Sequence, residues 1–149
     1  MYDLFDAPTR QSILERLGRI SAESPRQWGK MDAAQMCAHC AKALEVATGD
    51  HPRKRALIGI LLSWMVRKKL LGDAPFSKDS PTDPTFVVTD PRDFGVEKQR
   101  LLAVIQRFVE RGPERAAEAT HSFLGKLNGP EWGRVMGKHL DHHLRQFGG

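Results

Sequence analysis

Cysteines and long hydrophobic runs are scarce in this sequence, and each absence excludes a class of protein. The chain has 149 residues and only two cysteines, Cys37 and Cys40, which are too few for the disulfide scaffold of a small secreted domain. The longest apolar stretch, residues 56–66, is shorter than the ~20 residues that a transmembrane helix needs. Residues 1–10 lack the basic start and apolar run of a signal peptide. We therefore expect residues 1–149 to form a single cytoplasmic domain without a transmembrane segment.

The excess of positive charge is confined to one segment. The formal net charge is +5, yet residues 51–71 contain six basic side chains and no acidic one. The rest of the chain is therefore close to neutral. Trp64 is the only aromatic residue interleaved with these charges, and nucleic-acid binders usually combine the two. We therefore expect no nucleic-acid partner.

Helical periodicity and helix-capping residues dominate the sequence, whereas strand-like alternation is nearly absent apart from residues 85–89. The predicted helices cover residues 7–19, 32–48, 55–70, 93–112 and 128–147, and four of them begin with Asp6, Asp32, Asp93 or Asn128. Four prolines between residues 73 and 93 predict a surface loop inserted between helices. We expect an all-α four-helix bundle with one extra apolar helix and this inserted loop.

Three of the six histidines lie close together in the last predicted helix. His139 and His143 are one turn apart on the same helical face, about 6 Å along the axis, so their imidazoles could bind one metal ion. Apolar residues at the same spacing place both histidines toward the bundle interior. His39, on an apolar side of the second helix, is the best candidate for a third ligand. The alternative is a cluster favoured by the helix C-terminus, with His39 hydrogen-bonded in the core.

The remaining histidines have weaker assignments. His142 is rotated away from its two neighbours on the helix and is expected to flank the site. His121 precedes the last helix and could lie near the site as a proton shuttle or hydrogen-bond donor. His51 follows a helix end and is expected in a solvated loop. Asp141 is expected to face solvent, so no residue is assigned as general acid or base.

Cys37 and Cys40 flank His39 in the sequence. Cysteines three residues apart in an apolar helix usually act as small core residues, and the chain has no second pair to complete a four-thiolate zinc site. A redox motif of this spacing normally begins a helix, whereas this helix begins well before, at Asp32. The core interpretation is therefore favoured over a redox role.

Several stretches resemble the DinB/YfiT-like superfamily, and more narrowly a branch first described as a domain of unknown function. These are Ser24-Pro-Arg-Gln-Trp-Gly-Lys-Met31, Ala34-Gln-Met-Cys-Ala-His39 and residues 131–147, including Lys138-His-Leu-Asp-His-His-Leu-Arg-Gln-Phe147. His121-Ser-Phe-Leu-Gly125 is similar to a His-Pro-x-Phe-Gly stretch of that superfamily, with Ser122 in place of proline. The resemblance covers nearly the whole chain.

The resemblance implies a four-helix bundle, often dimeric, in which three histidines bind a divalent metal ion. The matching residues are His39, His139 and His143, and we expect zinc or nickel because imidazoles suit both. Three histidines leave a coordination position open, as in catalytic sites. Relatives include thiol-dependent transferases and isomerases, so the resemblance implies a small-molecule substrate and a low-molecular-weight thiol. Metal-dependent hydrolysis is the other chemistry that such a site permits.

The basic segment also admits a role without catalysis. Its charges, Arg53, Lys54, Arg55, Arg67, Lys68 and Lys69, bracket an apolar stretch that has no polar face. Such a helix suits a contact with the core or a partner subunit, as in a homodimer, better than a membrane surface. The alternative function is therefore an interaction protein with structural histidines, which binds a partner subunit or an anionic surface through this helix.

Overall fold

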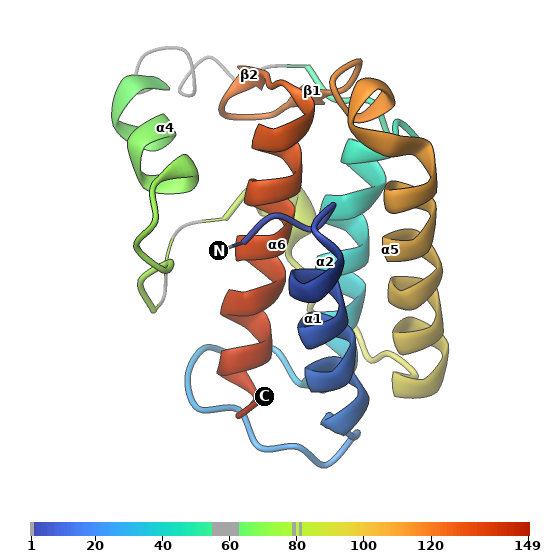
Figure 1. Cartoon of the computed structure of the whole chain (residues 1–149). Coiled ribbons are helices and arrows are strands. Elements are labelled where there is room, and N and C mark those ends of the chain that lie inside the picture. Colours follow the sequence, from blue (N-terminus) through green and yellow to red (C-terminus); the bar gives the residue numbers. More distant parts are fainter. Residues whose placement is uncertain (1, 55–62, 79, 81) are drawn as a thin grey trace.

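The computed structural model describes residues 2–54, 63–78, 80 and 82–149, and it confirms the all-α prediction. Four long helices form a bundle (Figure 1): α1 (Ala7–Arg19), α2 (Ala33–Ala47), α5 (Phe94–Ala116) and α6 (Gly129–Gln146). A shorter helix, α4 (Ser63–Leu71), lies beside α6 and outside the bundle. The other elements are a 3-10 turn, η1 (Pro84–Phe86), and an antiparallel hairpin of β1 (Thr120–His121) and β2 (Gly125–Lys126).

The starts of the four bundle helices are fixed by the capping residues that the sequence predicted. These are Asp6, Asp32, Asp93 and Asn128. Each side chain accepts a hydrogen bond from the backbone N–H three residues later, and Asp32 and Asn128 also receive the reciprocal bond of a capping box. Local sequence therefore determines where each bundle helix begins.

The stop predicted for α5 is a kink. Helical hydrogen bonding continues to Ala116, but Gly112 has a φ of 78°, which separates the last turn from the rest of the helix. The apolar spacing of this helix in the sequence predicts that Val96 shares its buried stripe, and that prediction is wrong because the Val96 side chain is 65% exposed. At about 100° per residue, Val96 points half a turn away from the buried Ile105.

The loop between residues 72 and 93 does more than cover the surface. Its strand-like stretch begins with η1, because Pro84 fixes φ and the Asp83 carboxylate accepts a hydrogen bond from Thr85 N at 2.9 Å. The Gln35 amide of α2 donates to Asp90 O at 3.2 Å. The loop is thus attached to α2 at the start of that helix.

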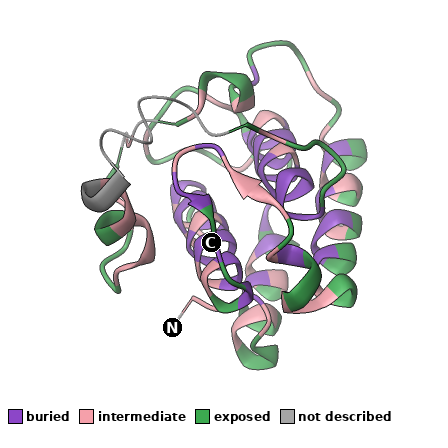
Figure 2. Cartoon of the chain, turned by 90° about the horizontal axis from the view of Figure 1, so that it is seen from above, coloured by how far each residue is buried: buried purple, intermediate pink, exposed green. Residues whose placement is uncertain are grey.

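The core is centred on α2, which is the most deeply buried helix of the four. Thirteen of its 15 residues are buried, and the buried faces of the bundle helices are turned toward one another (Figure 2). Cys37 and Cys40 are fully buried in this core as free thiols. Burial raises the pKa of the Cys37 thiol to about 12, so it stays a neutral core side chain as expected.

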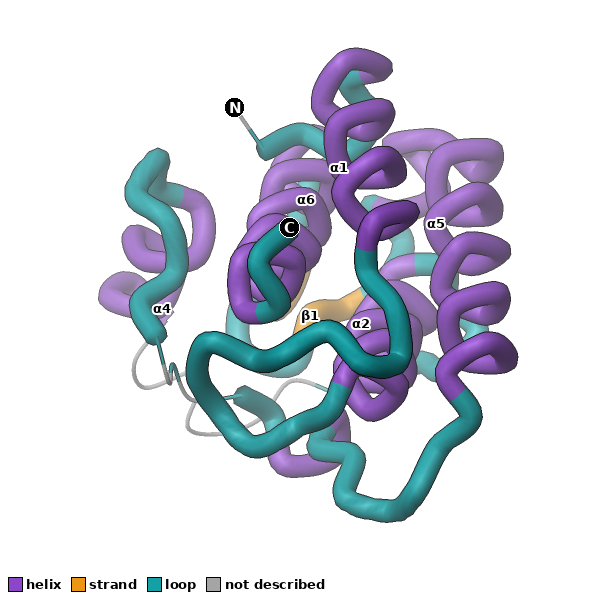
Figure 3. The backbone as a smooth tube through the Cα atoms, turned by 90° about the horizontal axis from the view of Figure 1, so that it is seen from below, coloured by secondary structure: helices purple, strands orange, loops and turns teal. Residues whose placement is uncertain are grey.

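Two chain segments lie against α6. The loop between α1 and α2 crosses the end of α6 (Figure 3), where Gln27 N donates to Gln146 O at 2.7 Å. Residues 2–4 cross the same helix near its middle, and Leu4 N donates to Gly133 O at 3.0 Å. A Cβ at Gly137 would overlap the backbone of Tyr2, so the close approach depends on glycine.

The extra apolar helix that was predicted over residues 55–70 is described in part. Residues 63–71 form α4, whereas residues 55–62 lie outside the described residues. The Lys138 ammonium group of α6 is fully buried and donates to Lys69 O at 2.7 Å and Gly72 O at 2.8 Å. Polar contacts therefore hold α4 against α6. None of the described helices is long and apolar enough to span a membrane.

Candidate metal centre

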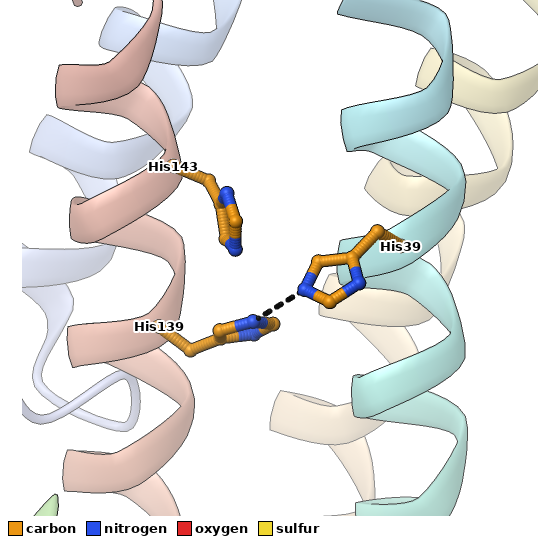
Figure 4. Close-up of side chains that lie close together, drawn as sticks. All are labelled: His39, His139 and His143. Atoms are coloured by element: carbon orange, nitrogen blue, oxygen red, sulfur yellow. Dashed lines mark hydrogen bonds between the residues drawn. The ribbon is translucent and has the colours of Figure 1, made fainter. Parts of the chain in front are cut away.

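The helices α2 and α6 direct three histidines toward one another. His39 comes from the middle of α2, and His139 and His143 come from successive turns of α6 (Figure 4). His39 and His143 are buried, whereas His139 is partly exposed. One ring nitrogen from each residue lies within 4.8 Å of the other two. The structure thus brings together the three residues that helical spacing singled out, and together they could hold a metal ion.

The distances between these nitrogens fit shared coordination. His39 Nε2 and His139 Nε2 are 3.0 Å apart, and the centroids of the three rings are 4.7 to 4.9 Å apart. Two nitrogens that each lie ~2.1 Å from one ion, at roughly right-angled to tetrahedral geometry, are about 3.0–3.4 Å apart. The first pair already has this separation, and a ring nitrogen of His143 lies within 4.8 Å of both.

A backbone carbonyl fixes the tautomer of His39. Its Nδ1 lies 2.9 Å from Phe86 O, at the end of η1. A carbonyl oxygen only accepts hydrogen bonds, so the Nδ1 atom of His39 carries the proton and Nε2 keeps its lone pair. In the 3.0 Å contact with His139, the proton therefore belongs to His139 Nε2. A metal ion would take the place of that proton.

A glutamine from the same helix fixes the tautomer of His143. Its Nδ1 lies 2.8 Å from Gln146 Oε1, and Gln146 Nε2 donates to Trp28 O at 2.7 Å. The contact with a carbonyl determines which end of the amide is the nitrogen, so its oxygen must face His143. His143 therefore holds its proton on Nδ1 and presents the Nε2 lone pair to the cluster.

The loop between α1 and α2 has a specific role in this arrangement. Gly29 has a φ of 79°, and a Cβ at this position would overlap the Gln146 amide. The glycine lets the chain turn so that Trp28 O reaches Gln146. The stretch around Trp28-Gly29, which contributed to the family resemblance, thus supports His143 from the opposite end of the sequence.

Burial keeps the three imidazoles neutral. Desolvation lowers the pKa of His39, lowers that of His143 to about 3 and lowers that of His139 well below its ordinary value. The neighbouring imidazoles act in the same direction. Neutral imidazole is the form that binds metal ions. The site is therefore ready to bind an ion at neutral and mildly acidic pH.

His142 flanks the cluster, as its helical angle predicted. Its side chain is buried, with its ring centroid 5.0 Å from that of His143. The rings of Trp28 and Phe76 lie 5.6 and 6.0 Å from it. His142 is therefore part of an aromatic wall beside the site and outside the group of three ligating nitrogens.

His121 lies in the hairpin rather than in the cluster. Its Nδ1 accepts hydrogen bonds from Phe123 N at 3.1 Å and Leu124 N at 3.2 Å, so its proton resides on Nε2. The His121 ring packs 5.5 Å from the Trp132 ring, and burial lowers the pKa of the imidazole to about 4. This histidine stabilises its own turn and offers one N–H donor.

The exposure of His51 agrees with the expectation from the sequence, and that of Asp141 does not. The solvated position of His51 is confirmed, since its side chain is 65% exposed. The expectation that Asp141 faces solvent is wrong, because its side chain is only 15% exposed and forms ion pairs with Arg16 at 2.8 Å and Arg145 at 3.0 Å. Packing of α1 against α6 brings Arg16 to it. Asp141 is thus a structural link between two helices.

Sequence reasoning missed the two groups that orient the ligands. Gln146 had a usable signal, because it follows His143 by three residues and so lies on the same helical face. Phe86 had none, because the group that contacts His39 is a backbone carbonyl.

Comparisons with known proteins identify the family. The model of a family described as "Protein of unknown function (DUF1569)" matches residues 5–148. No curated protein and no solved structure matches the chain. The matched range includes all three clustered histidines, Gln146 and the loop that holds it. The chain therefore belongs to the DUF1569 family.

Proposed function

We propose that the chain binds a divalent metal ion through His39, His139 and His143, and that it is a DinB-like enzyme acting on a small molecule. The observation that carries the proposal is the convergence of the three ring nitrogens. In addition, hydrogen bonds at Nδ1 fix the tautomers of His39 and His143. In the absence of an ion, the Nε2 lone pair of His39 is met by the His139 N–H. A cation at this point would be met by the lone pairs of all three imidazoles at once.

The donor set favours particular ions and a particular kind of site. Imidazole nitrogen suits zinc and nickel, and three protein ligands leave at least one coordination position open for a water or substrate. When bound, such an ion lowers the pKa of a coordinated water or thiol, which then acts as a nucleophile near neutral pH. The resemblance to the DinB/YfiT-like superfamily supports a thiol-dependent transferase ahead of a hydrolase.

The chain's own residues would bind and orient the reactants. Phe86 O and Gln146 Oε1 hold two imidazoles in place, which preorganises the site. His139 is the most exposed of the three ligands, so a small molecule would approach on its side. Trp28 and His142 belong to the aromatic wall next to His143, which would limit the access of water on that side.

The proposal is tested by the metal content of protein purified without a histidine tag. The wild-type chain is incubated with zinc or nickel, dialysed, and analysed by elemental mass spectrometry beside His39→Ala, His139→Ala and His143→Ala. A His51→Ala variant is the matched control, because His51 is exposed and outside the cluster. We expect one ion per chain in the wild type and in the control, and loss of the ion in the other three. Folded wild-type protein that retains no metal would contradict the proposal.

A second candidate function rests on α4. This helix lies outside the bundle and exposes Lys68 and Lys69, as a site for a partner subunit or an anionic surface would. This second function predicts that the metal-free protein binds anionic vesicles, with an affinity that falls as salt is added. Substitution of both lysines by glutamine would weaken this binding, and an unchanged affinity would exclude the charge-driven version.

A further inference from the structure

A cleft with a surplus of positive charge lies where α2 and α5 end. It has a volume of about 670 Å³. Its lining combines the ends of the two helices, the segment after α2 and the start of the hairpin: Val46, Thr48, Gly49, Pro52, Arg53, Arg111, Arg115, Glu118, Ala119 and Thr120. None of the three clustered histidines lines it. The cleft is thus separate from the candidate metal centre.

The charges of the lining do not cancel. Arg53, Arg111 and Arg115 face a single acidic residue, Glu118. The Glu118 carboxylate already forms an ion pair with Arg115, at 3.1 Å. Among the described residues, the one ionic contact of Arg111 is with Asp50, at 3.8 Å. Arg107, which does not line the cleft, lies nearer to Asp50, at 2.8 Å. Arg111 is therefore left with little compensation, whereas Arg53 has the Asp83 carboxylate in its neighbourhood, whose pKa its charge helps to lower.

Arg53 is the most informative residue of the cleft. Its guanidinium carbon lies 5.4 Å from the centre of the Phe86 ring, so the aromatic face supports the flat group. Its Nε atom is buried and has no hydrogen-bond partner in the part of the chain that the structure describes. Buried donors are nearly always paired in native proteins. An unpaired one in a cleft leaves a donor available to an acceptor atom of a ligand.

Helix electrostatics do not account for this arginine. Arginines near helix C-termini often complement exposed carbonyl groups. At the end of α2, however, backbone N–H groups of Thr48, Gly49 and His51 already bond to carbonyls of the last turns. The Thr48 hydroxyl bonds to Glu45 O as well. The carbonyls of Leu44, Glu45 and Val46 are thus paired without Arg53.

We infer that this cleft binds an oxyanion, the phosphate or carboxylate group of a small molecule, through Arg53 and Arg111, with Arg115 at the rim. The planar guanidinium presents donors in a fork that matches two oxygens of such a group. An oxyanion would supply the missing acceptor to Arg53 and the missing charge to Arg111. The inference does not depend on the metal proposal.

The test is calorimetric titration of the purified chain with inorganic phosphate and, separately, with acetate, at constant ionic strength. We expect the wild type to bind at least one of the two, and Arg53→Gln and Arg111→Gln to weaken binding about tenfold or more, since each removes charged hydrogen bonds. Arg19→Gln is the matched control, because Arg19 is an exposed arginine in the last turn of α1. Its affinity should equal that of the wild type. The anion that binds distinguishes a phosphate ligand from a carboxylate ligand.

Two further variants keep the result decisive. Arg53→Lys retains the charge and loses the fork, so it should bind more weakly than the wild type even if Arg53→Gln does not fold. His143→Ala should bind the anion normally, because this histidine lies outside the cleft. Absence of binding by folded wild-type protein would overturn the inference. Loss of binding in His143→Ala but in neither arginine variant would also overturn it, by placing the anion at the histidines.

Discussion

Gln146 determines where His143 carries its proton. Its amide is held by Trp28 O at one end and accepts from His143 Nδ1 at the other. The amide is buried, since the residue is only 3% exposed, so water cannot easily replace it. A residue that binds nothing itself thus makes the Nε2 lone pair of His143 available for an ion.

Replacement of Gln146 should therefore weaken metal binding without removing a ligand. We expect Gln146→Ala to lower the affinity for zinc by about 10–100-fold, because the His143 ring loses the acceptor that orients it. Competition with a chromophoric chelator measures the affinity. Gln106→Ala is the control, since Gln106 is exposed on α5 and bonds only to Glu110 in the described residues. Equal zinc affinities in a folded Gln146→Ala variant and the wild type would show that the amide does not support the ligand.

The ligand cluster could be predicted from sequence, but its support could not be predicted in full. His139 and His143 share a face because of the helical period, and one apolar side of α2 directs His39 inward. The partner of His39 is a backbone carbonyl 47 residues away, and no side-chain pattern identifies such an acceptor. The burial of Asp141 was missed because its partner Arg16 lies 125 residues away.

At the scale of elements, the attachment of α4 to the bundle depends on a lysine of α6. The Lys138 ammonium group donates to carbonyls of residues 69 and 72, where α4 ends and its unpaired carbonyls point outward. Arg134 adds a bond to Leu71 O at 2.9 Å. Burial lowers the pKa of Lys138, yet its carbonyl contacts at residues 69 and 72 are those of the protonated form. Side chains of the bundle thus supply the C-terminal cap of a helix outside it.

We expect Lys138→Met to loosen α4 selectively. The substitution keeps the apolar part of the side chain but leaves the carbonyls at the end of α4 unpaired, at a cost of roughly 1–3 kcal/mol in the free energy of unfolding. Hydrogen exchange should show faster exchange in residues 63–71 and unchanged protection in α2. Lys68→Met is the control, since Lys68 is exposed on the same helix. Identical exchange profiles for the two variants would contradict this role of Lys138.

The helices were predictable to the extent that their signals are local. Capping side chains lie three residues from the N–H that they accept, so the starts of α1, α2, α5 and α6 follow from the sequence. The hairpin was not predicted, because its strands have only two residues each and no alternation develops over that length. The sequence predicts that α5 ends at Gly112, where the structure has a kink, because a Gly-Pro pair is typical of helix ends and of kinks.

At the scale of the whole molecule, the bundle encloses imidazoles that must stay neutral. In the folded chain the pKa of His143 is about 3 and that of His121 about 4, against about 6.5 for an unfolded histidine. Between these values the unfolded chain binds more protons than the folded one. The two neutral histidines therefore make their full contribution to the free energy of unfolding above about pH 6.5. That contribution decreases as the pH falls below this value, because the unfolded chain then takes up protons that the folded chain does not.

The metal-free protein should lose stability between pH 7 and pH 5. The expected loss is about 2 kcal/mol in the free energy of unfolding for each of His121 and His143. Urea unfolding at both pH values measures it. In His143→Gln the decrease should be smaller than in the wild type, because one of the two groups no longer titrates. Equal stability of the wild type at the two pH values would contradict the prediction.

The position of α2 also bears on how the protein matures in the cell. His39 and His139 are 100 residues apart, and at about 5–20 residues per second the ribosome needs some 5–20 seconds to pass from one codon to the other. During the first half of that time α2, which is buried almost throughout in the finished fold, has neither α5 nor α6 to pack against, because α5 begins only at Phe94. An ion delivered to the nascent chain would meet a single histidine of the site. Under the proposed function, an ion would therefore be bound by all three histidines only after translation of the last helix, when the folded bundle offers them together.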